Sequence, residues 1–134
     1  MAAVDRDTTR MDVVTRSIDL GAGARGMMTA WRAGRAWQRV RLESRGEGFV
    51  TTDTYWLHDG LCVAARLESV RPDERPKVER IWFRDSTLYR WTDAAGRRME
   101  RDARSTQSEV GMLRTRLDRA LQQLDTVPAP RSGR

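Results

Sequence analysis

The residue types best suited to acid–base or nucleophilic chemistry lie close together near the middle of the chain. His58 is the only histidine and Cys62 the only cysteine among the 134 residues, and Asp59 follows the histidine directly. A neighbouring carboxylate can orient an imidazole as a general base, and a nearby base can activate a thiol as a nucleophile. No sequence motif connects either residue to such a partner, and Asp-Gly is the pair that tight hairpin turns prefer. We therefore expect a turn at Asp59-Gly60, a small or apolar position for Cys62, and no catalytic residues.

The small number of histidine and cysteine residues argues against a metal ion or a cofactor. One histidine and one cysteine cannot form a metal site based on these ligands, and the acidic residues lack the close spacing of a calcium loop. Residues 21–26, GAGARG, have the spacing of a dinucleotide-binding loop, but the residues after them are typical of a strand and not of a helix. We expect a connecting loop there, and neither metal nor cofactor.

Aromatic and arginine residues form the pattern that best indicates binding. We expect the following residues on corresponding faces of one sheet: Trp56, Arg80, Trp82, Tyr89 and Trp91. Exposed aromatic rings could stack against bases or sugars, with arginine adding cation–π attraction. The alternative is that the same rings form the core on which a helix packs. Where they are uncovered, these five residues are the predicted binding surface.

Three turn signals predict the elements that carry these residues. Ala33-Gly34, Asp59-Gly60 and Asp85-Ser86 each separate two β-prone runs and lie at equal spacing, which suggests an internal repeat of hairpins. The Arg-Leu-Glu-Ser segments at 41–44 and 66–69 are offset by one residue from that spacing, so either a bulge absorbs the slip or the match is chance.

Two-residue turns also predict the register of the second and third hairpins. The expected partners are Leu57 with Cys62, Trp56 with Val63, Asp53 with Arg66, Phe83 with Leu88, and Trp82 with Tyr89. The Asp53–Arg66 pair would be a favourable cross-strand contact between opposite charges.

The apolar period changes from that of strands to that of a helix near residue 105. From there to about residue 125, apolar residues recur at three- and four-residue steps: Val110, Leu113, Leu117, Ala120, Leu121 and Leu124. The sequence thus predicts an α+β domain over residues 11–125, with an antiparallel meander of six or seven strands and one C-terminal amphipathic helix. Residues 1–10 are expected to form a flexible arm and residues 126–134 a disordered tail.

The charge of the chain favours an anionic partner. The formal net charge is +6, from 25 basic and 19 acidic residues, although the arginines are spread along the chain and not gathered in one run. No apolar run approaches the roughly 18–20 residues of a spanning helix. The first residues lack a signal-type apolar segment, so we expect a cytoplasmic protein, or an exported one whose leader has been removed.

Three segments resemble the repeats of a group of small bacterial proteins. Residues 54–69, TYWLHDGLCVAARLES, and 78–97, VERIWFRDSTLYRWTDAAGR, are similar to repeats of the type aromatic-aromatic-x-x-Asp-Gly-x-Leu, and residues 27–44 resemble a degenerate copy. The resemblance covers about residues 25–98. It implies a β-rich protein of a group that is usually uncharacterised and often exported or lipoprotein-like, with no known enzymatic activity.

Together these features predict a non-enzymatic binding module that engages a protein or another macromolecule through an exposed sheet face or edge. Nucleic-acid binding through arginines and stacked aromatics is the alternative. A third interpretation is a small enzyme or pocket protein inside a curled sheet, which requires a pocket holding His58 and a second titratable group.

Overall fold

The computed structural model describes residues 12–21, 24–46, 48–84, 87–98 and 103–128. Within these ranges, seven strands form one antiparallel sheet in which each strand pairs with its neighbours in sequence. The strands are β1 (Asp12–Gly21), β2 (Ala24–Ala33), β3 (Ala36–Gly46), β4 (Phe49–His58), β5 (Leu61–Val70), β6 (Lys77–Arg84) and β7 (Thr87–Thr92), and the helix is α2 (Ala103–Leu124). The predicted α+β class, a meander followed by one C-terminal helix, is confirmed.

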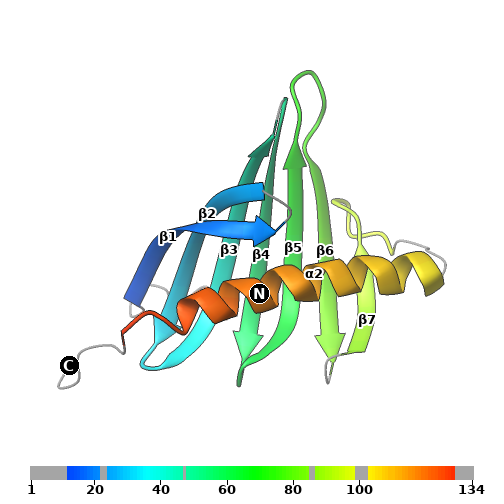
Figure 1. Ribbon diagram of the computed structural model, residues 1–134. Coiled ribbons are helices and arrows are strands. Elements are labelled where there is room, and N and C mark those ends of the chain that lie inside the picture. The colour runs from blue at the N-terminus through cyan, green and yellow to red at the C-terminus, as the bar shows by residue number, and fades with distance from the viewer. Residues whose placement is uncertain (1–11, 22–23, 47, 85–86, 99–102, 129–134) are drawn as a thin grey trace.

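The helix covers one face of the sheet and runs across the strands, with its C-terminal end beside β1 (Figure 1). Its buried apolar residues, Val110, Leu113, Leu117, Ala120 and Leu124, pack against apolar side chains from all seven strands. Polar contacts attach its end to β1: Gln123 Nε2 donates to the Asp19 carbonyl oxygen at 3.3 Å, and Arg16 Nη1 donates to Thr126 Oγ1 at 3.0 Å. Val127 packs against the core, so both Thr126 and Val127, which the sequence predicts to belong to a disordered tail, contact the domain.

Each of the three hairpins β2–β3, β4–β5 and β6–β7 contains one register shift near its turn. The extra residues are Gln38, Val63 and Tyr89, each of which has no direct partner across the hairpin. Such a bulge increases the local twist, which helps a sheet to curl around a helix. It also places the residues on either side of it on opposite faces, because the extra residue breaks the two-residue alternation.

The bulges explain which predicted pairs are wrong. Next to the turns, Leu57 pairs with Cys62 and Phe83 with Leu88, as predicted. Beyond the bulges the partners move by one residue, so Trp56 pairs with Ala64, Asp53 with Leu67, and Trp82 with Arg90. The predicted Asp53–Arg66 contact is absent, since Arg66 pairs with Thr54 on the other face.

The first hairpin turn also differs from the prediction. Ala33 pairs with Ala36, so the turn consists of Gly34-Arg35 and not Ala33-Gly34. With this turn, the Arg-Leu-Glu-Ser segments 41–44 and 66–69 lie at the same distance after their own turns, and no slip between them has to be absorbed. Asp85-Ser86 and the predicted arm, 1–10, lie outside the described residues.

Candidate functional site

The sheet face opposite α2 carries two adjacent rows of side chains rich in arginine and tryptophan. The register places these residues in the first row: Trp31, Arg39, Trp56, Ala64, Trp82 and Arg90. The second row contains Arg41, Thr54, Arg66 and Arg80. We call the eight arginine and tryptophan residues of these rows the Arg–Trp face. Bulges create it, because they turn Arg39 and Arg90 away from the helix while Trp37 and Leu88 face the core.

Several arginines of the Arg–Trp face lie over tryptophan rings. The guanidinium carbon of Arg39 is 3.9 Å from the centroid of the Trp31 ring, and that of Arg41 is 5.4 Å from the same ring. Arg90 lies 5.5 Å from the Trp82 ring centroid. A guanidinium held against an aromatic plane loses fewer rotamers when its N–H groups bind an anion. The Trp31 and Trp82 rings thus position the guanidinium groups that lie over them.

The two rows contain no carboxylate among their described residues. The next row, farther from the β2–β3 and β4–β5 turns, contains Glu43 and Glu68. Both acids pair with neighbouring arginines: Glu68 with Arg66 at 3.1 Å and Glu43 with Arg45 at 3.4 Å. Arg41 and Arg90 are exposed, and Arg39 and Arg80 are partly exposed. The Arg–Trp face therefore presents positive charge beside its tryptophans.

The structure brings together three of the five residues predicted for binding. Trp56, Arg80 and Trp82 lie on the Arg–Trp face, although Trp56 is only 5% exposed. Trp91 lies on the opposite face, 4% exposed in the core, where its Nε1–H donates to Glu79 Oε2 at 3.3 Å. The bulge at Tyr89 places Trp91 there. The Tyr89 side chain is outside the described part of the structure.

His58 and Cys62 lie on opposite faces of the β4–β5 hairpin, since His58 pairs with Leu61 and Cys62 pairs with the buried Leu57. The His58 side chain is 76% exposed at the end of β4, with Nε2 3.4 Å from Asp59 Oδ2. Cys62 lies under the helix, its Sγ donates to the Ala64 carbonyl oxygen at 3.3 Å, and burial raises the pKa of its thiol to about 11. A thiol with this pKa is a poor nucleophile near neutral pH. The described residues also contain no group of three or more potential metal ligands.

A polar cluster that the sequence did not predict lies between the sheet and the helix. Asp53 Oδ2 accepts hydrogen bonds from Arg116 Nη1 at 2.9 Å and from the Tyr55 hydroxyl at 3.4 Å. Burial raises the pKa of Asp53, and attraction to Arg116 opposes the rise. Burial, together with the charge of Asp53, holds the pKa of Tyr55 well above its usual range. The one sequence signal for this cluster is a lone acid in a strand whose neighbours alternate toward the core.

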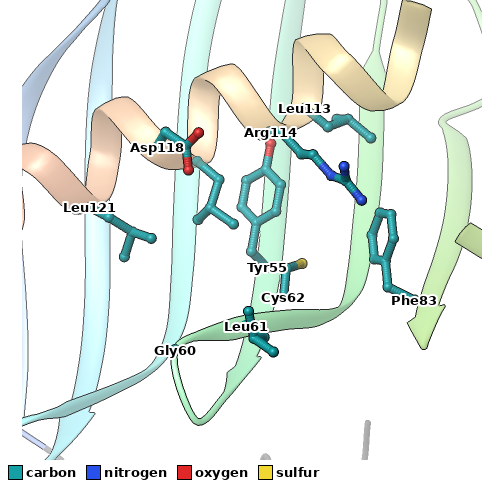
Figure 2. A pocket seen from close by; sticks show the side chains of 10 residues that line it. Tyr55, Gly60, Leu61, Cys62, Phe83, Leu113, Arg114, Asp118 and Leu121 are labelled. Carbon is teal, nitrogen blue, oxygen red and sulfur yellow. The ribbon is translucent and has the colours of Figure 1, made fainter. Parts of the chain in front are cut away.

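A pocket of about 250 Å³ opens between α2 and the turn end of β4 and β5 (Figure 2). It is lined by Tyr55, Gly60, Leu61, Cys62, Phe83, Leu113, Arg114, Leu117, Asp118 and Leu121. It lies on the helix side of the sheet, away from the Arg–Trp face. His58 does not line it, so the interpretation as a pocket enzyme built on His58 has no support from this geometry.

Comparison of the chain with known proteins identifies no relative. No protein-family model, curated protein sequence or solved structure matches the chain. No helix in the described ranges is long and apolar enough to cross a membrane.

Proposed function

We propose that the protein is a non-enzymatic binding module whose Arg–Trp face binds the phosphate backbone of a single-stranded nucleic acid. The observation that carries the proposal is the pair of adjacent rows in which arginines lie over or beside tryptophans without an intervening carboxylate. Guanidinium groups bind phosphate oxygens through two parallel N–H donors, and phosphate contacts supply most of the affinity in sequence-independent binding.

The geometry favours phosphate contacts over base stacking as the main source of affinity. Trp56 is buried, and the guanidinium of Arg39 lies over the Trp31 ring that a base would need. The arginines between β3 and β7 span four interstrand spacings, or about 19 Å, which matches several nucleotides of an extended strand.

The character of the face also favours a nucleic acid over a protein partner. Stable protein interfaces have an apolar, desolvated centre. The exposed large apolar side chains on this side of the sheet are Val13, Met27, Leu61 and Val70, which belong to β1, β2 and the two ends of β5. They do not form a patch at its centre.

The test is fluorescence anisotropy with a labelled, mixed-sequence DNA strand. If Arg39, Arg41, Arg80 and Arg90, the arginines of the face other than the Glu68-paired Arg66, contact phosphates, affinity should fall about 50-fold between about 50 and about 200 mM salt. The double variant Arg41→Gln/Arg80→Gln should weaken binding and reduce the slope of log affinity against log salt concentration by about half. The matched control, Arg75→Gln/Arg119→Gln, makes the same change in net charge in the loop after β5 and on α2, and should bind like the parent.

Two results would contradict this function. One is an equal loss in the test and control variants, which would show that only net charge matters. The other is displacement of the DNA by poly-glutamate at the same charge concentration, which would indicate an acidic protein partner.

A further inference from the structure

The pocket beneath α2 has the size and the walls of a small-molecule site. Its sheet side is formed by Tyr55, Cys62 and Phe83, and its helix side by the leucines that face the sheet. An apolar cavity of about 150 Å³ is enough to hold benzene, so the volume of about 250 Å³ accommodates a somewhat larger molecule. The Leu61 side chain, 52% exposed, lies at the pocket's edge and extends its apolar surface.

Two charged residues of the helix distinguish the two ends of this pocket. In Figure 2 the Arg114 guanidinium extends toward Phe83, and Asp118 lies at the end near Leu121. The guanidinium carbon of Arg114 is 5.9 Å from the Phe83 ring centroid. The charge of Arg114 also reaches the inner wall, where it favours the thiolate form of Cys62 and so opposes the dominant effect of burial on the thiol pKa. The Phe83 end of the pocket is therefore electropositive.

We infer that this pocket binds a small monocarboxylate with an apolar body, of the size of a medium-chain fatty acid. Its carboxylate lies at Arg114 and its chain lies along Leu113, Leu117 and Leu121. Asp118 is at the other end and is exposed to solvent, where water screens its repulsion of the carboxylate. The site is on the other side of the sheet from the Arg–Trp face, so it is independent of the proposed nucleic-acid binding.

Calorimetry with sodium octanoate and the full chain tests the inference. We expect binding of one octanoate per chain, and a loss of about tenfold in affinity for Arg114→Gln, since a charge-assisted hydrogen bond is lost. Affinity for octan-1-ol, which has no charge, should not change in that variant. Arg119→Gln, also an exposed arginine of α2, is the matched control and should bind octanoate like the parent.

Two further measurements locate the ligand. Leu121→Trp should fill the pocket and abolish binding of both octanoate and octan-1-ol. Cys62 is the only cysteine, so octanoate should slow its modification by methyl methanethiosulfonate if the ligand is in the pocket. The variant Arg41→Gln/Arg80→Gln should keep full octanoate affinity, which separates this site from the Arg–Trp face. Absence of octanoate binding, unchanged Cys62 modification, or equal losses in Arg114→Gln and Arg119→Gln would overturn the inference.

Discussion

Asp53 in β4 and Arg116 in α2 form an ion pair that joins the sheet to the helix, with 2.9 Å between Arg116 Nη1 and Asp53 Oδ2. The two side chains differ in environment, since that of Asp53 is 9% exposed and that of Arg116 is 41% exposed. The carboxylate therefore depends on the arginine and on the Tyr55 hydroxyl in place of the water it has lost.

Removing the arginine should cost more than removing a surface charge. Arg116→Met leaves Asp53 buried without its cationic partner, so we expect the free energy of unfolding to fall by about 1–2 kcal/mol. The loss is smaller than for a fully buried ion pair, because water partly screens the charge of Arg116. Urea denaturation near neutral pH measures this change. Arg119→Met, at an exposed position of the same helix, should change stability by less than about 0.5 kcal/mol. In the Asp53→Asn background the effect of Arg116→Met should shrink, and an undiminished effect would show that Arg116 acts independently of Asp53.

The same carboxylate should make stability depend on pH. Burial raises the pKa of Asp53 above 3.8, in spite of Arg116, so the folded protein holds this proton more tightly than the unfolded chain. The stabilisation linked to protonation is complete below pH 3.8 and is lost as the pH rises through the folded-state pKa. The free energy of unfolding of the parent, measured relative to that of Asp53→Asn, should therefore decrease as the pH rises from below 3.8 to neutrality. A shift in the opposite direction would mean that Arg116 outweighs burial.

The elements of the fold were predictable from sequence because their signals are local. The Asp59-Gly60 turn and the helical period of the C-terminal segment each depend on residues within a few positions of one another. The faces of the strands were not predictable, because nothing in the residue types of Gln38, Val63 and Tyr89 distinguishes bulged positions from paired ones. A single bulge moved Trp91 from the expected binding face into the core.

In the candidate sites too, features that depend on nearby residues are predictable from sequence, and features that depend on contacts between distant segments are not. The Arg–Trp face was partly anticipated, since Trp56, Arg80 and Trp82 were identified by type and spacing. The pocket and the Asp53–Arg116 pair were not anticipated, because each joins the sheet to α2 across a long stretch of chain, and the position of the helix on the sheet is set by packing of the whole domain.

Two glycines should respond to alanine with opposite signs. Gly60 has a φ of +79° in the turn after β4, where alanine is strained although no atom lies within 4 Å of its added carbon. Gly60→Ala should lower the free energy of unfolding by about 1 kcal/mol. Gly111 is in α2 with equally open space, so Gly111→Ala should raise it by about 0.5–1 kcal/mol through helix propensity. Thermal or urea denaturation of the two variants checks both signs, and destabilisation by Gly111→Ala would contradict the assigned helix environment.

Cys62 should react slowly with thiol reagents, with a rate controlled by its thiolate fraction. Burial, which outweighs the hydrogen bond to Ala64 and the charge of Arg114, raises its pKa to about 11 from 9.0. Near about pH 8 the thiolate fraction, and with it the alkylation rate by iodoacetamide, should be about 100-fold lower than in the urea-unfolded chain. The folded-state rate should rise about tenfold per pH unit until the pH approaches the thiol pKa, because only the thiolate reacts. A pH-independent rate would show that opening of the structure, and not ionisation, limits the reaction. A plateau well below pH 11 would show instead that Arg114 stabilises the thiolate more than burial destabilises it.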